Sequence, residues 1–184
     1  MRRFVQSLAA VLGIAALGAC NGGGSVLNVG GTPNPTAVIV TVQSPQNIAR
    51  VVPGGSLPIS ALGVIGSQNG ATYTGQFRWS AALVPTGGTY FVTPGVSRAC
   101  AAVTITPTGG SATPYFADFS LYITIDPTNE QNILFAPPPV VPSPTGTTVS
   151  APYPYCVVVS ATAMNGGAVG SITVAVVDPQ NPLQ

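Results

Sequence analysis

The stretch Tyr73-Thr74-Gly75-Gln76-Phe77-Arg78-Trp79-Ser80 indicates the fold class of this chain. Its polar residues alternate with a second series, which consists of Tyr73, Gly75, Phe77 and Trp79. A period of two is typical of a β-strand with one buried face, because successive side chains point to opposite faces of a sheet. We therefore expect a strand here whose aromatic side chains enter a hydrophobic core.

Segments on both sides of this stretch extend the β pattern. Valine, isoleucine and threonine, which favour strands, are concentrated at residues 36–42, 57–64, 101–106, 116–125, 155–161 and 170–177. Turn sequences, which join strands into hairpins, lie between several of them: Pro53-Gly54-Gly55, Asn69-Gly70 and Asn165-Gly166-Gly167. The pattern predicts an all-β protein from residue 36 onward.

The N-terminus has a different character. Arg2 and Arg3 precede a short apolar run, residues 4–19, which ends on the small residues Gly18 and Ala19. A transmembrane helix needs about 20 apolar residues, and this run is shorter. A positive start, an apolar centre and small residues at the end are the features of a cleaved export signal. We therefore expect a signal helix that is removed, and no membrane span.

The end of that run, Leu17-Gly18-Ala19-Cys20, resembles the lipobox of bacterial lipoproteins. The resemblance implies that residues 1–19 are removed and that Cys20 becomes an acylated first residue, held in the membrane by chains such as palmitate. Several buried acyl chains make a stable anchor. Asn21 follows, where the family's sorting rule favours the outer membrane. Two alternatives are an ordinary secretory signal and a twin-arginine signal based on Arg2 and Arg3.

The order of the strands and turns resembles that of bacterial Ig-like domains. The matching features are the strand from Val38, the turn Val52-Pro53-Gly54-Gly55, the strand Leu57–Leu62, the segment Phe77-Arg78-Trp79-Ser80 and the closing hairpin at 155–177. The resemblance implies an Ig-like β-sandwich over residues 36–184, after a flexible Gly-rich tether at 20–35. Residues 94–154 exceed what such a domain needs and are expected to be an insertion with extra strands. The alternative is two small domains joined by the Pro-rich residues 137–146.

Two cysteines remain after lipidation of Cys20. In an oxidising envelope compartment we expect Cys100 and Cys156 to form a disulfide, and the alternative is two free buried thiols. Cys156 shares strand parity with Ser160 and Thr162, so the bridge is expected on the outer face of its sheet or at the edge.

Charge and composition exclude several function classes. Only 5% of the chain is charged, and it contains no lysine and no histidine. A nucleic-acid-binding protein would need a basic patch. Ser-His-Asp, Cys-His and Ser-Lys catalytic arrangements need residues that are missing. We therefore expect no catalysis, no cofactor and no nucleic-acid partner.

Two weaker patterns suggest ligands. Asp126, Asn129 and Glu130 offer oxygen ligands to Ca²⁺, although Asp followed by Pro is also typical of a β-turn. Tyr90, Tyr153 and Tyr155 lie on or beside expected loops, where aromatic side chains stack on sugar rings in binding modules. The alternative for these tyrosines is packing against the sheets.

Together these patterns predict a lipid-anchored Ig-like structural or interaction module of the bacterial cell envelope. Its expected location is the outer membrane, on the periplasmic or the surface face. Its expected partners are the membrane, through the lipid, and envelope proteins or further copies of the chain. The alternative is a lipoprotein that binds a glycan or another small ligand through its loop aromatics.

The anchor is tested by Cys20→Ser, because a serine hydroxyl cannot form the thioether. The variant should lose acyl labelling and membrane fractionation, whereas Asn21→Ser, which leaves the cysteine in place, should retain both. A Cys20→Ser protein that still carries lipid would contradict the anchor.

Overall fold

The structure is a computed structural model, and it describes residues 34–44, 48–66, 71–93 and 95–182. The expected signal helix, Cys20 and the tether up to residue 33 lie outside these residues, as does the Asn69-Gly70 turn. Residues from Asn34 onward form one compact unit.

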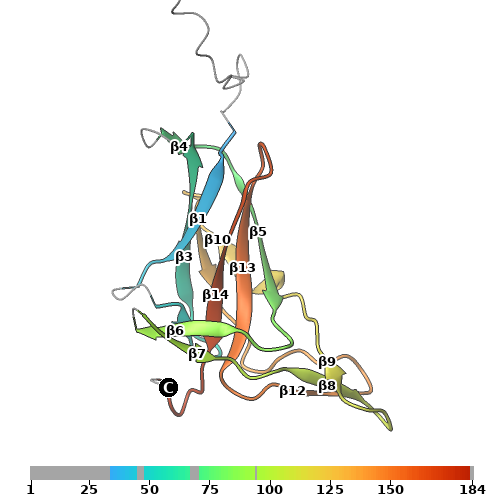
Figure 1. Cartoon of the computed structure of the whole chain (residues 1–184). Helices are drawn as coiled ribbons and strands as arrows, with labels where there is room; N and C mark the ends of the chain where they lie inside the picture. The colour runs from blue at the N-terminus through green and yellow to red at the C-terminus, as the bar shows by residue number, and fades with distance from the viewer. Residues whose placement is uncertain (1–33, 45–47, 67–70, 94, 183–184) are drawn as a thin grey trace, which may run out of the picture. The chain divides into compact units, whose positions relative to one another are not determined.

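Two β-sheets form the body of this unit (Figure 1). The first has the strand order β1-β3-β11-β10, with β4 also paired to β3; its strands are β1 (Ala37–Val42), β3 (Leu57–Ile65), β4 (Ala71–Tyr73), β10 (Ile123–Ile125) and β11 (Asn132–Phe135). The second has the order β2-β14-β13-β5, from β2 (Arg50–Val51), β5 (Phe77–Leu83), β13 (Tyr155–Ala163) and β14 (Val169–Val176). All pairs are antiparallel except β2 with β14. The fold is all-β and compatible with a β-sandwich.

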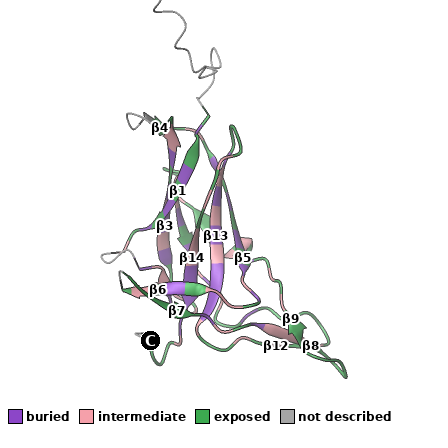
Figure 2. Ribbon diagram, in the orientation of Figure 1, coloured by how far each residue is buried: buried purple, intermediate pink, exposed green. Residues whose placement is uncertain are grey.

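The core lies between the two sheets (Figure 2). Inward positions alternate with outward ones, as in β5, where Phe77, Trp79, Ala81 and Leu83 are buried and the residues between them are exposed. The same buried cluster includes Ile59 and Ile133 from the first sheet and Val157, Val159 and Val174 from the second. Removal of apolar surface from water is the main favourable contribution to folding, and this alternation supplies it from both sheets.

The stretch 73–80 is divided between the sheets, which corrects the expectation of one strand. Tyr73 ends β4 in the first sheet, and Phe77 begins β5 in the second. The chain crosses between them at Gly75, where a Cβ atom would lie 2.3 Å from the Tyr73 hydroxyl oxygen. Only glycine leaves room for the Tyr73 ring there, and the ring packs edge-on against Phe77 with 5.3 Å between centroids. The expected burial of the aromatic side chains is confirmed.

Residues 84–154 add two small sheets to one end of the body (Figure 1). One is the hairpin of β6 (Thr89–Thr93) and β7 (Val96–Ala99); the other has the order β12-β8-β9, from β8 (Thr104–Pro107), β9 (Thr113–Pro114) and β12 (Thr147–Ser150). The expected strand at 101–106 begins only at Thr104. We refer to residues 84–115 and 136–154, which carry these two sheets, as the arms.

The expected strand at 116–125 is wrong for most of its length. Asp118 makes a single bridge to Ala82, a 3₁₀ turn follows at Ser120–Tyr122, and β10 covers only the last three residues. The Asp118 carboxylate accepts a hydrogen bond from the Ser120 backbone N–H at 2.8 Å. Such side chain–backbone bonds compete with strand pairing, and here the turn ends the extended segment.

The arms lie at the opposite end of β13 from the start of the described chain. Asn34 lies beside Gly166 in the turn after β13, whereas Cys100 in an arm is bonded to Cys156 at the beginning of that strand. The eight residue steps of β13 separate these ends by about 26 Å. Asn34, where the described chain begins, is therefore remote from the Cys100–Cys156 attachment of the arm.

The core assignment predicts that alanine substitution of two isoleucines on paired strands lowers the free energy of unfolding by different amounts. Ile59→Ala should lower the free energy of unfolding by roughly 2–5 kcal/mol, because the side chain is fully buried and its loss leaves a cavity. Ile39→Ala, at 48% exposure, should change it by about 0.5 kcal/mol or less. Urea unfolding of both variants measures the difference, and equal costs would contradict the assigned faces of this sheet.

Candidate functional site

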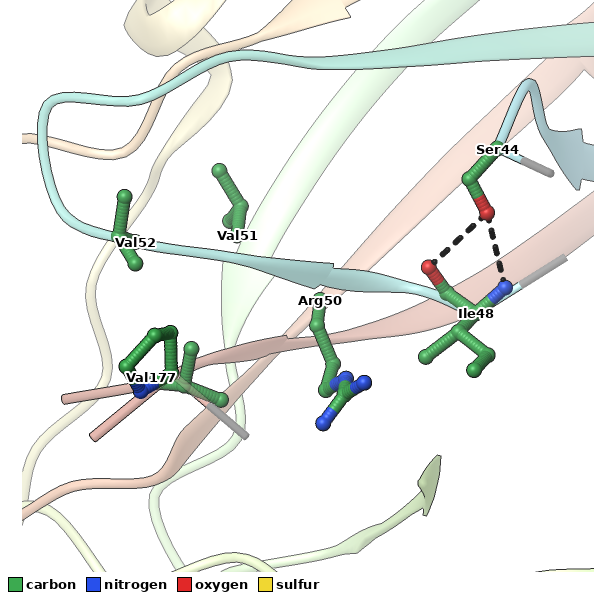
Figure 3. A pocket seen from close by; sticks show the side chains of 7 residues that line it. Ser44, Ile48, Arg50, Val51, Val52 and Val177 are labelled. Carbon is green, nitrogen blue, oxygen red and sulfur yellow. Dashed lines mark hydrogen bonds between the residues drawn. The ribbon is translucent and has the colours of Figure 1, made fainter. Parts of the chain in front are cut away.

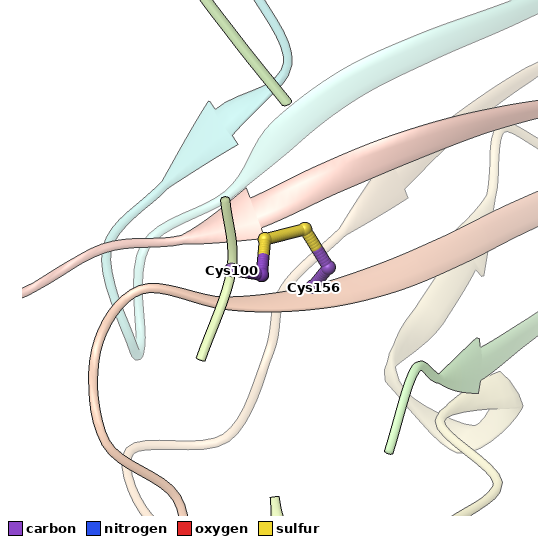
Figure 4. Close-up of a disulfide and its surroundings, with 2 residues drawn as sticks. All are labelled: Cys100 and Cys156. Carbon is purple, nitrogen blue, oxygen red and sulfur yellow. A yellow bond between two sulfur atoms is a disulfide. The ribbon is translucent and has the colours of Figure 1, made fainter. Parts of the chain in front are cut away.

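A disulfide joins Cys100 to Cys156, with 5.7 Å between Cα atoms (Figure 4). Cys156 lies on the face of β13 opposite Val157 and Val159, as its strand parity predicts. At Cys156 that face is nevertheless buried, because Tyr90 and Cys100 pack on Cys156, Ala175 and Val177 in a second hydrophobic cluster. The bridge therefore ties an arm over the outer face of the second sheet.

The Asp126–Glu130 segment forms the turn between β10 and β11. The Asp126 carboxylate accepts hydrogen bonds from the Thr128 backbone N–H at 2.8 Å and the Thr128 hydroxyl at 2.7 Å. These bonds, the side-chain one foremost, hold the Asp126 pKa below its usual value. Asn129 accepts from the Gln131 N–H at 3.1 Å, and the Glu130 carbonyl accepts from the Trp79 indole at 3.1 Å. The three residues form a hydrogen-bonded turn of the kind that Asp before Pro indicates, and among the described residues no three His, Cys, Asp or Glu side chains gather as a metal site.

The three tyrosines proposed as a sugar platform do not form one exposed surface. Tyr90 is 2% exposed and Tyr155 1% exposed, whereas Tyr153 is 38% exposed. Tyr153 stacks on Tyr155 with ring centroids 5.7 Å apart. Burial raises the pKa of both phenols, and the charge of Asp178 adds to the effect on Tyr153. Only Tyr153 can present a ring face, and it borders a small hollow formed with Pro139, Val140, Val149 and Ala151.

A larger hollow lies at the β2 edge of the second sheet (Figure 3). It encloses about 360 Å³ between mainly aliphatic side chains, and Arg50 is the one charged residue that lines it. The Ser44 hydroxyl accepts a hydrogen bond from the Ile48 N–H at 3.0 Å and faces the Ile48 carbonyl at 3.4 Å. No acid and base meet here, so this hollow contains no pair suited to proton transfer.

A third hollow lies on the outer face of the first sheet, and Asp126 is the one lining residue that the sequence pattern indicated as a candidate, for calcium. It encloses about 330 Å³, and Gln43, Asp126 and Asn132 line it together with Pro58, Ile125 and Leu134. The signal in the sequence was weak: polar Ser60 and Asn132 occupy outward positions in otherwise apolar strands. That they meet depends on the pairing of β3 with β11, which places Ser60 opposite Asn132 across 72 residues of chain.

Large exposed apolar side chains are concentrated between β5 and β13. All three exposed aromatic side chains of the described residues, Phe91, Phe116 and Tyr153, lie in this part of the chain. Val96 and Val140 in the arms are 51% and 77% exposed. Residues 84–115 carry one charge, Arg98, so this arm presents a nearly neutral surface.

No protein-family model matches the chain, and comparisons with curated proteins and with solved structures also found no match. Within the described residues, no helix has the length and apolar character to cross a membrane.

The disulfide is tested by alkylation and by its effect on stability. Denatured protein should take up no alkyl group at Cys100 and Cys156 until it is reduced, and two afterwards. The double variant Cys100→Ala, Cys156→Ala should lose about 4 kcal/mol of unfolding free energy, because the bridge closes a long loop in the unfolded chain. Reaction of both thiols without reductant would show that the bridge is not formed.

Proposed function

We propose that this chain is a lipid-anchored, non-catalytic interaction module of the bacterial cell envelope, with an Ig-like sandwich as its body. The lipobox resemblance at Cys20 supports the anchor and an outer-membrane location. A core without buried charged or polar side chains among the described residues supports a structural role. In this proposal the body separates the anchored end from the arms, which contact the partner.

The observation that carries the proposal is the exposure of apolar side chains on the arms. Phe91 and Val96 lie near the tip of the β6–β7 hairpin at 61% and 51% exposure. They contribute little to the chain's own core, and aromatic residues are enriched where proteins meet. The disulfide attaches this hairpin to β13, so the apolar tip is held in a defined position and loses less conformational freedom on binding.

The partner should be a protein surface that is itself apolar and weakly charged. Arg98 is the only charged residue among residues 84–115, so this arm offers a strongly charged partner just one possible ion pair. A second copy of the chain meets this requirement, because two nearly neutral arms do not repel each other. Another envelope protein with an apolar surface meets it as well.

A second candidate function is small-ligand binding at Tyr153. Its ring borders a hollow of about 210 Å³ that also contains Val140 and Val149. The exposed Tyr153 ring and the aliphatic side chains beside it can pack against the apolar face of a small ligand. Loss of glycan-array binding in Tyr153→Ala would favour this candidate.

The interaction proposal predicts a partner in native membranes. Extracted in mild detergent, the protein should run as a homo-oligomer or with a stoichiometric partner. Phe91→Asp should reduce that association, because a carboxylate would be desolvated at the contact. Met164→Asp is the matched control, since Met164 is equally exposed at 61% but lies in the turn at the far end of β13.

Two outcomes would contradict this proposal. One is a monomer without partner in native extracts. The other is equal loss of association in Phe91→Asp and Met164→Asp, which would show that the arm tip is not the contact.

A further inference from the structure

Three strands and the turn after β10 bring a row of polar side chains together on the outer face of the first sheet. The register pairs Thr41 with Ser60 and Ser60 with Asn132. The Asp126 N–H then donates to the Asn132 carbonyl, which places Asp126 next in the same row. Within the described residues, no strand of an arm pairs with the first sheet, whereas Tyr90 and Cys100 of an arm pack on the outer face of the second sheet.

Hydrogen bonds fix the orientation of the central side chain in this row. The Ser60 hydroxyl donates to Asn132 Oδ1 at 2.8 Å, and Gln43 Nε2 donates to the same oxygen at 3.3 Å and to the Ser60 hydroxyl. With its oxygen engaged twice, Asn132 has both amide N–H groups left to donate. Neither these N–H groups nor Gln43 Oε1 has a hydrogen-bond partner within the described residues.

Asp126 adds a charged acceptor at the edge of the hollow. One of its carboxylate oxygens accepts both bonds from Thr128, which sets the orientation of the group, and a carboxylate has lone pairs for further hydrogen bonds. Those bonds favour the ionised form, so the group accepts hydrogen bonds at neutral pH. The Asn132 amide is therefore an oriented donor and the Asp126 carboxylate an oriented acceptor on the same small surface. Asn132 belongs to a paired strand, and Asp126 belongs to the turn that precedes this strand.

The remaining wall is apolar. Pro58 and Leu134 are paired neighbours on β3 and β11, and Ile125 lies at the end of β10. The hollow is open to solvent, and its volume of about 330 Å³ is at the lower end of the range for small-molecule sites. Apolar walls with a few fixed polar groups are the usual composition of such sites.

We propose that this hollow binds a neutral polyhydroxylated ligand of the size of one sugar residue. The Asn132 amide donates to one ligand oxygen, Asp126 and Gln43 Oε1 accept from neighbouring hydroxyls, and the C–H face of the ligand lies on Leu134 and Pro58. An anionic ligand would meet Asp126 without any cationic side chain among the lining residues. The proposal is independent of the anchor and of the arm contact, since it involves neither Cys20 nor the arms.

The test uses the full chain, purified in a detergent that has no sugar headgroup. The probes are the methyl glycosides of glucose, galactose, mannose and N-acetylglucosamine at millimolar concentration, with saturation-transfer NMR as the measurement. At least one glycoside should bind. Asn132→Asp keeps the shape of the side chain but removes both donors, and it should weaken binding about tenfold or more. Asp126→Asn keeps an acceptor for Thr128 and removes the charge, so it should also weaken binding while the turn stays folded.

Asn129→Asp is the matched control, because it makes the same change three residues away and keeps the acceptor for the Gln131 N–H. Binding should be unchanged in this variant. Saturation transfer to none of the four glycosides would overturn the proposal. Binding that persists unchanged in both Asn132→Asp and Asp126→Asn would also overturn it. If Tyr153→Ala then abolished that binding, the ligand would belong to the Tyr153 hollow.

Discussion

Packing against both faces of β13 is the interaction on which the rest of the structure depends. One face places Val157, Val159 and Ala161 in the core between the sheets, where all three are fully buried. The other face carries Cys156, which holds Cys100 and the arm that follows β5. The strand is also paired on both sides, with β5 and with β14. A change in its register by one residue would exchange these two faces and remove both clusters at once.

The chain obtains its stability with very few charges. None of the buried side chains among the described residues is polar or charged, so the fold incurs little cost from desolvated polar groups. The same composition leaves little charge on the surface to keep copies apart. This low surface charge is one of the observations that support the proposed interaction module. The proposed arm contact relies on apolar surface held by the fold, and the proposed hydroxylated-ligand hollow relies on oriented polar side chains that include one charged group, Asp126.

Strands rich in β-branched residues could be predicted from the sequence, whereas roles that depend on a partner strand could not. The strands at 36–42, 57–64, 155–161 and 170–177 are confirmed, because their valine, isoleucine and threonine residues favour extended backbone, and β1 and most of β3 bury alternate side chains. The alternation at 73–80 predicted burial correctly and the strand incorrectly, since Gly75 allows the chain to change sheets without a break in the pattern. At 116–125 the β-rich composition suggested a strand, but local bonds from Asp118 favoured a turn.

By itself, the sequence determined the all-β class, the burial of Tyr73, Phe77 and Trp79, the outward parity of Cys156 and the lack of catalytic histidine or lysine. These properties follow from residue type and short-range periodicity. The tertiary structure decided that the arm covers Cys156, that Tyr90 and Tyr155 are buried, and that Gln43, Ser60 and Asn132 meet on one sheet face. Each of these depends on the pairing of strands far apart in the chain. The free energy of such pairing comes from packing between sheets, which no local stretch of sequence specifies.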